Sequence, residues 1–144
     1  MGRILVIDDS VTVALAVRCA LAADGHEVEA ITSVTSLFRQ LRERAPDVIL
    51  LDLEMPGFSG LDFGGMIRAY ERGRTQVIIH SSRPREDLLA AARIVGAVDV
   101  ISKGSSLSEL RRVVTRALDQ ARFERPSNSH VGTAQDASPV SKVR

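Results

Sequence analysis

Three carboxylates, one hydroxyl and one ammonium follow short apolar runs of this 144-residue chain. Asp8 and Asp9 follow the first run and Asp52 the third, while Ser81 and Lys103 follow the fourth and the fifth. Two carboxylates about 4 Å apart repel by roughly 4 kcal/mol at an effective dielectric of 20, so three together need a cation or raised pKa values. Such oxygen ligands favour Mg²⁺ over zinc, and a carboxylate beside a metal and an ammonium can be a nucleophile toward phosphorus.

The Asp8–Asp9 pair taken alone is more typical of a turn or of a helix N-terminus, and only the five groups together favour chemistry. The position of Lys103 adds to that argument. All the other basic residues within residues 1–123 are arginine. The single lysine therefore stands where a compact ammonium on a flexible stem is required and a planar guanidinium is no substitute.

The apolar runs are predicted strands, because they are short and rich in Val and Ile. Three of them lack polar alternation, which is typical of strands that helices cover on both faces. The predicted strands are Arg3–Ile7, Glu27–Ile31, Asp47–Leu51, Gln76–His80 and Val98–Ile101.

Helix-length segments separate these runs. The first predicted helix begins after the N-cap Ser10 and ends near Asp24, and Ser33 caps the second. Further helices are predicted over residues 61–72 and 85–95, and a last one follows Ser105 or Ser106. That last helix carries an apolar stripe of Leu107, Leu110, Val114, Ala117, Leu118 and Ala121.

Five alternating strand and helix units predict the α/β class, as a (βα)5 doubly wound parallel sheet of five strands with right-handed crossovers. Ligands of such sheets bind beyond the carboxyl ends of the strands. The five groups named above are expected to meet there.

Composition limits the partners and the location. The formal net charge is only +1, so neither nucleic acid nor membrane is an expected partner. The apolar runs are too short for a membrane span, and the first one ends at Asp8, unlike a signal sequence. We expect a cytoplasmic protein with one domain over residues 1–123 and a disordered tail or linker stub over 124–144. Cys19, the single cysteine, is expected to be a buried, inert thiol.

The sequence resembles the receiver domain of two-component response regulators, the CheY-like family, over about residues 2–123. The resemblance rests on VIDDS, LLDLEMPGFSG, HSS and GAVDVISKG, whose joint spacing is highly specific. It implies a flavodoxin-like sheet with the strand order 2-1-3-4-5.

The resemblance also implies the role of each site residue. Asp52 would be the phosphoacceptor, Ser81 would bond the phosphoryl group through its hydroxyl, and Lys103 would pair with it. Mg²⁺ would be held by Asp8, Asp9, Asp52 and the backbone carbonyl of Glu54. The phosphodonor would be a histidine kinase or a phosphotransfer protein. Apart from this self-phosphorylation and dephosphorylation, no enzymatic activity is expected.

Two positions depart from the family pattern. Val100 replaces the usual aromatic ring that reports phosphorylation, so coupling to the surface of the fourth helix, fifth strand and fifth helix is expected to be weak. Gly104 replaces a proline in a cis bond, and we expect a trans bond there because a non-proline cis bond costs about 2.5 to 4 kcal/mol.

Neighbouring residues suggest finer roles. His80 is expected to be a packed, hydrogen-bonded core residue rather than a base. Glu54 and Arg83 lie near the expected path of water to the phosphoryl group. The first helix is apolar nearly all round, either because it is deeply packed or because it docks the phosphodonor. Arginines 111, 112 and 116 are expected to form a solvated face.

Two alternatives remain. A pseudo-receiver would bind proteins without phosphorylation, and Val100 and Gly104 would be its signs. A phosphatase of the haloacid dehalogenase type also uses an aspartate nucleophile, but its D-x-D signature is absent after the first strand. The chain is either a stand-alone regulator or the receiver of a longer protein.

Overall fold

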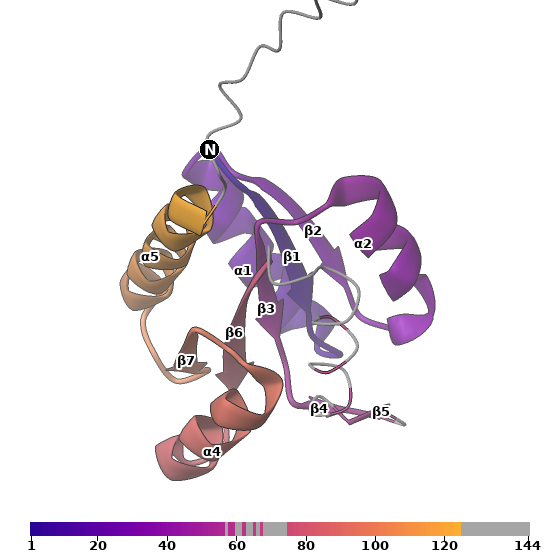
Figure 1. Ribbon diagram of the computed structural model, residues 1–144, viewed down its shortest axis with the longest axis vertical. Coiled ribbons are helices and arrows are strands. Elements are labelled where there is room, and N and C mark those ends of the chain that lie inside the picture. Colours follow the sequence, from indigo (N-terminus) through magenta and orange to yellow (C-terminus); the bar gives the residue numbers. More distant parts are fainter. Residues whose placement is uncertain (57, 60–61, 63–64, 66, 68–74, 125–144) are drawn as a thin grey trace, which may run out of the picture.

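The computed structural model describes residues 1–56, 58, 59, 62, 65, 67 and 75–124 (Figure 1). Its main sheet has five parallel strands in the order β2-β1-β3-β6-β7. The strands are β1 (Arg3–Ile7), β2 (Glu27–Ile31), β3 (Val48–Leu51), β6 (Gln76–Ser81) and β7 (Asp99–Ser102). Each lies within one residue of its predicted bounds, and the order is the 2-1-3-4-5 order that the resemblance implied.

The helices follow the predicted caps closely. They are α1 (Val11–Ala23), α2 (Leu37–Arg44), which the 3-10 turn Val34–Ser36 precedes, α4 (Arg85–Val95) and α5 (Leu107–Glu124). Ser10 Oγ accepts the amide of Val13 at the start of α1. Before α5 it is Ser106 whose hydroxyl accepts an amide, that of Glu109.

Helices cover both faces of the sheet. One apolar cluster joins the sheet to α1 and α5 through Val6, Leu50, Ile78, Leu21 and Val114. On the other face, Leu37 and Leu41 of α2 pack on Ile49 and Leu51, and α4 packs on Ile79 and Val100. This is the doubly wound arrangement that the strand pattern predicted.

Two residues that were predicted to be buried are exposed. Leu107 is 48% exposed at the first turn of α5, although the rest of the predicted stripe is buried. Cys19 is exposed on α1, because the packed side of that helix consists of Ala14, Val17, Ala20 and Leu21. The outer side of α1 is thus apolar and exposed at Val11 and Leu15.

Two further elements bear on the predictions. The short antiparallel strands β4 (Glu54–Met55) and β5 (Phe58–Ser59) follow β3 and were not predicted. The predicted helix over 61–72 and the predicted tail lie almost wholly outside the described residues, although α5 itself reaches Glu124. Within the described part of the chain, none of the helices is long and apolar enough to cross a membrane.

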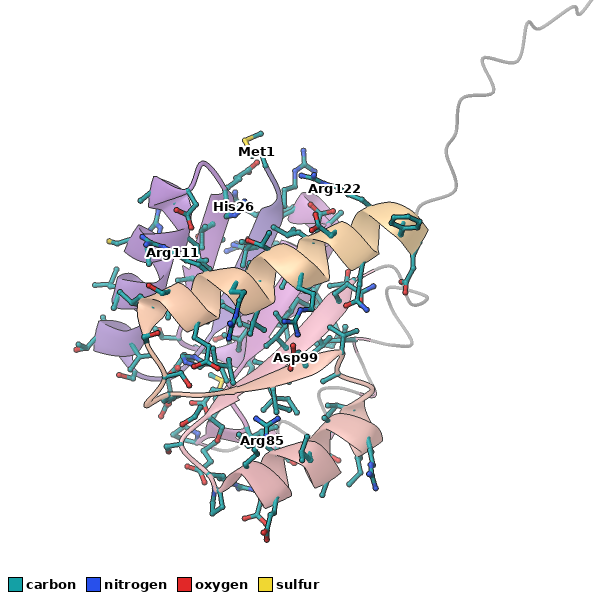
Figure 2. The ribbon with its side chains drawn as sticks, turned by 90° about the vertical axis from the view of Figure 1, so that its left-hand side faces the viewer. Met1, His26, Arg85, Asp99, Arg111 and Arg122 are labelled. Carbon is teal, nitrogen blue, oxygen red and sulfur yellow. The ribbon has the colours of Figure 1, made fainter. Side chains whose placement is uncertain are left out.

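The start of the chain packs against the end of α5. The amide of Gly2 donates to His26 Nδ1 over 3.2 Å, and the Arg122 guanidinium donates to the carbonyl of Met1 over 3.4 Å. Figure 2 shows these side chains at one end of the molecule, whereas Arg85 of α4 lies at the other. The carboxyl ends of the strands are therefore far from this pole.

Candidate functional site

Three carboxylates meet at the carboxyl ends of β1 and β3. Asp8, Asp9 and Asp52 each place an oxygen within 4.8 Å of the other two. Asp8 is 1% exposed and Asp52 is 4% exposed, whereas Asp9 is open to solvent. These residues meet as predicted, because the carboxyl ends of neighbouring parallel strands lie side by side at one edge of the sheet.

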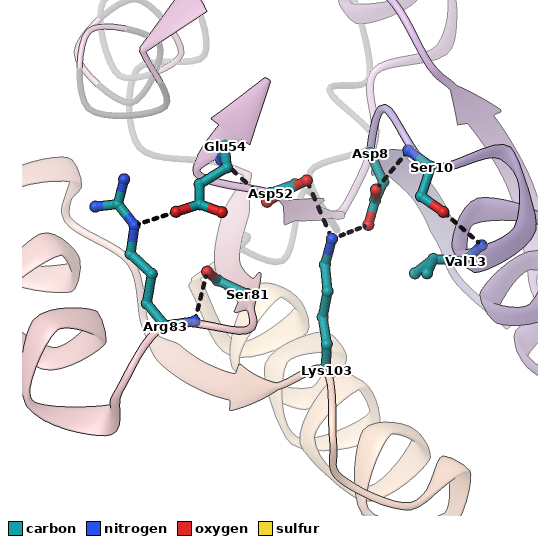
Figure 3. A network of polar contacts seen from close by, with 8 residues as sticks. All are labelled: Asp8, Ser10, Val13, Asp52, Glu54, Ser81, Arg83 and Lys103. Carbon is teal, nitrogen blue, oxygen red and sulfur yellow. Dashed lines mark hydrogen bonds and ion pairs between the residues drawn. The ribbon is translucent and has the colours of Figure 1, made fainter. Parts of the chain in front are cut away.

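Lys103 lies against both buried carboxylates (Figure 3). Its Nζ is 2.9 Å from Asp8 Oδ2 and 3.1 Å from Asp52 Oδ2. Burial alone would lower the pKa of Lys103, but the hydrogen bonds and charges of Asp8 and Asp52 outweigh it and raise that pKa above its ordinary value. The ammonium thus stays charged throughout the physiological range.

Backbone amides hold the remaining carboxylate oxygens. Asp8 Oδ1 accepts the amide of Ser10 over 2.9 Å, and Asp52 Oδ1 accepts the amide of Glu54 over 3.0 Å. Each buried carboxylate therefore has one oxygen on the backbone and the other on Lys103. This arrangement fixes both side chains before any ligand arrives.

Ser81 lies at the end of β6 and is fully buried. Its hydroxyl oxygen accepts the amide of Arg83 over 3.2 Å, and its carbonyl accepts the amide of Lys103 over 3.0 Å. The second bond ties the lysine's backbone to β6. Gly104 follows with a trans bond, as expected, since the described residues contain no cis peptide.

An ion pair that the sequence did not reveal crosses the mouth of the site. Arg83 Nε donates to Glu54 Oε1 over 2.8 Å, and both side chains are about half exposed. With Asp9 they line an open pocket whose other walls are Leu53, Met55, Pro56 and Ser59. Their sequence positions had placed both near the site, but nothing in the spacing showed that they pair.

The donor set fits a hard divalent cation. Three carboxylates and one ammonium, all counted as ionised, leave a formal charge of −2, and the described metal ligands all offer oxygen. Asp9 leaves the cluster open to solvent on one side, which suits Mg²⁺ because that ion retains several waters. Whether the Glu54 carbonyl joins the ligands stays a prediction.

The two other residues that the sequence singled out lie inside the fold. Val100 is 6% exposed and packs with Leu88, Ala91 and Val95 toward α4. His80 is 7% exposed, as expected, but its imidazole makes no hydrogen bond within the described residues. The prediction of a hydrogen-bonded core histidine was therefore only half right.

Known proteins resemble this chain over most of its length. A profile described as the response regulator receiver domain matches residues 4–115. A protein-glutamate methylesterase/protein-glutamine glutaminase of Anaeromyxobacter dehalogenans is 36% identical over 129 residues, which cover 84% of this chain and 37% of that protein. The transcriptional regulatory protein KdpE of Mycobacterium tuberculosis is 32% identical over 88% of this chain and 57% of its own length.

A solved structure agrees with these matches. The response regulator receiver domain protein from Clostridium thermocellum superposes with a TM-score of 0.76 at 28% identity, over 85% of this chain and 98% of that one. The two sequence relatives above are longer, and this chain spans between 37% and 57% of their length. The similarity therefore concerns one domain of those relatives.

Proposed function

Because the chain belongs to the family of response regulator receiver domains, we propose that Asp52 accepts a phosphoryl group from the phosphohistidine of a histidine kinase or phosphotransfer protein. Receiver domains of two-component systems in general accept phosphoryl groups with Mg²⁺ at an acidic pocket. The contact of one ammonium with both Asp8 and Asp52 is the observation that carries the proposal here.

The transfer has a simple balance of bonds. A carboxylate oxygen of Asp52 attacks phosphorus, the P–N bond to the donor's imidazole breaks, and its electron pair leaves with that nitrogen. Lys103 neutralises the arriving phosphoryl oxygens, and the Ser81 hydroxyl turns from its amide contact to donate to one of them. The hydrogen bond from the Lys103 amide to the Ser81 carbonyl ties the backbones of these two residues together.

Mg²⁺ would be held by Asp8, Asp9, Asp52 and the Glu54 carbonyl, and when bound it supplies further positive charge to the phosphoryl oxygens. The self-phosphorylation and dephosphorylation of Asp52 are the only chemistry proposed.

The proposed unit of function is the domain over residues 1–123, with 124–144 as tail or linker stub. Its state would pass to a protein partner through a surface that changes on phosphorylation, in the cytoplasm. The competing function is a pseudo-receiver that binds partners without phosphorylation. Retention of all five site residues favours the first.

Incubation with acetyl phosphate and Mg²⁺, followed by mass spectrometry of the intact protein, tests the proposal. We expect one added phosphoryl group, which is absent in Asp52→Ala and in wild-type protein with a chelator. Asp62→Ala, in which an exposed aspartate outside the cluster is removed, is the matched control and should be modified like the wild type. An unmodified wild-type protein would establish the pseudo-receiver instead.

A further inference from the structure

The ammonium of Lys103 reaches its carboxylate partners across another strand. Lys103 directly follows β7, which forms the edge of the sheet, while Asp52 follows β3 and Asp8 follows β1. The strand β6 lies between β3 and β7. The stem of Lys103 therefore has to pass over the end of β6 to make its contacts of 2.9 and 3.1 Å.

The strand register identifies which side chain of β6 lies beneath that stem. Val6, Leu50 and Ile78 are in register on adjacent strands and face α1 and α5. Successive side chains along a strand point to opposite faces, so residues two positions further along each strand face the same side again. These residues are Asp8, Asp52 and His80.

The partner of His80 on β7 confirms this placement. His80 pairs with Ile101, which belongs to the same apolar cluster, and Lys103 lies two residues beyond Ile101. Lys103 and His80 thus share one face of the sheet, with the acceptor Asp52 on the neighbouring strand.

The imidazole of His80 is suited to a place beside an ammonium because it is neutral. Burial lowers the pKa of His80 most, and the charge of Lys103 lowers it further against the opposing effect of Asp8 and Asp52. A neutral imidazole carries one nitrogen that accepts a hydrogen bond. An ammonium has three donors. One of them bonds Asp52 Oδ2, whereas the contact with Asp8 Oδ2 is an ion pair without hydrogen-bond geometry, so the ammonium keeps a donor for another acceptor.

We propose that His80 is a positioning residue for Lys103: its imidazole supports the lysine stem and accepts an ammonium N–H that Asp52 does not use as the ammonium turns toward a phosphoryl group on Asp52. This inference rests on the proposed function for its role in phosphorylation, but the placement of the ammonium does not depend on it.

The small number of lysines makes the ammonium observable. Lys103 and Lys142 are the only lysines, so lysine labelled with ¹³C at Cε and ¹⁵N at Nζ gives two side-chain signals in an NMR spectrum. A Lys103→Arg sample assigns them. We would compare the wild type with His80→Gln, which keeps an acceptor, and with His80→Leu, which does not.

In His80→Leu we expect the Lys103 signal to move and the phosphorylation rate at saturating acetyl phosphate to fall by about threefold or more, because a displaced ammonium stabilises the transferring oxygens less well. His80→Gln should restore both toward the wild type, and the midpoint for Mg²⁺ should stay the same. If circular dichroism shows that the leucine variant is unfolded, His80→Val takes its place.

Two results would overturn the inference: an unchanged Lys103 signal and rate in the apolar variant, or equal losses in the glutamine and apolar variants. The NMR comparison needs no phosphodonor. A wild-type protein that fails to become phosphorylated would therefore end the proposed function while the lysine signal still decided the placement of the ammonium.

Discussion

Two buried carboxylates depend on a single ammonium at this site. Asp8 and Asp52 are almost completely buried, and the Lys103 ammonium is the cation that contacts both of them in the described structure. A buried charge is tolerated only when it is paired and hydrogen-bonded. Without a metal ion the cluster still holds more negative than positive charge, so part of the folding free energy is lost to repulsion.

Replacement of the acceptor by its uncharged isostere should therefore stabilise the metal-free protein. We expect Asp52→Asn to raise the free energy of unfolding by about 1 to 2 kcal/mol, below the ~3.5 kcal/mol that Coulomb's law gives for two unit charges 4.8 Å apart at an effective dielectric of 20. Urea denaturation in chelator measures this. With excess Mg²⁺ the advantage should vanish, and a variant less stable than the wild type in both buffers would contradict the argument.

The Glu54–Arg83 ion pair should set how long the phosphoryl group lasts. Both side chains border the open pocket beside Asp9, so we expect their pairing to narrow the approach of water to the phosphoryl group. We expect Glu54→Ala and Arg83→Ala each to shorten the half-life of the phosphorylated protein by about two- to tenfold, within the usual range for access and positioning effects.

A charge-reversed double variant provides the control for that pair. Glu54→Arg combined with Arg83→Glu should recover much of the half-life, measured by the release of inorganic phosphate after removal of acetyl phosphate. Two single variants with a longer half-life than the wild type would show that the pair assists water instead.

At the scale of residues, the sequence predicted the members of the site but not all their contacts. Asp8, Asp9, Asp52 and Lys103 meet because strand ends fix their backbones, and strand ends can be recognised from apolar runs. The Glu54–Arg83 contact depends on the rotamers of two long, exposed side chains, about which sequence spacing says nothing.

At the scale of elements, we expect Val100 to determine how β7 responds to phosphorylation of Asp52. It is buried against α4 and lacks the ring that would move inward behind Ser81. We expect beryllofluoride with Mg²⁺ to shift backbone amide signals strongly around Ser81 and only weakly along α5. Equally large shifts in both places would show that β7 and α5 couple to the site without an aromatic residue.

The exposed apolar side of α1 is expected to receive the phosphodonor. Val11 and Leu15 are 59% and 49% exposed, and Cys19 is exposed one turn further on. A maleimide on Cys19 should block transfer from a phosphorylated histidine kinase, while phosphorylation by acetyl phosphate continues at the normal rate. Unlabelled Cys19→Ser is the control, and unimpaired transfer to the labelled protein would place the docking surface elsewhere.

Helices and strands could be predicted from the sequence where their apolar pattern extends over several residues. The strands and caps agree with the structure because apolar runs and capping serines have local causes. The two-residue strands β4 and β5 are too short for any period. Leu107 and Cys19 were assigned to the interior from residue type alone, although many apolar side chains remain at a protein surface.

At the scale of the whole molecule, the pole opposite the site contains a pH-sensitive contact. His26 accepts the amide of Gly2, and burial lowers its pKa, as do the amino terminus and Arg122, against an opposing effect of Asp24. The folded protein thus binds a proton here less readily than the unfolded chain, whose histidine titrates near 6.5. The contribution of this contact to stability is complete above that pH and is lost as the pH falls.

Thermal unfolding at several pH values measures that effect. Between pH 7.5 and 5.5 the midpoint of the wild type should fall more than that of His26→Asn, whose amide oxygen can accept the same bond without titrating. The difference should be on the order of 1–2 °C, because the ring is only partly buried. Parallel curves for the two proteins would show that His26 does not contribute.

The length and anchoring of α5 have a mechanical consequence. Its 18 residues begin beside the site and extend about 27 Å to the far pole. There Gln76 Nε2 donates to Glu124 Oε2 over 2.7 Å, and Arg122 contacts the first residue of the chain. A helix of this length that was held only at its first turn would move its C-terminal end by about 0.5 Å for each degree of tilt. Because the C-terminal end of α5 is also held in place, this helix resists tilting at both ends. A tilt of its first turn would first stretch the Gln76–Glu124 hydrogen bond.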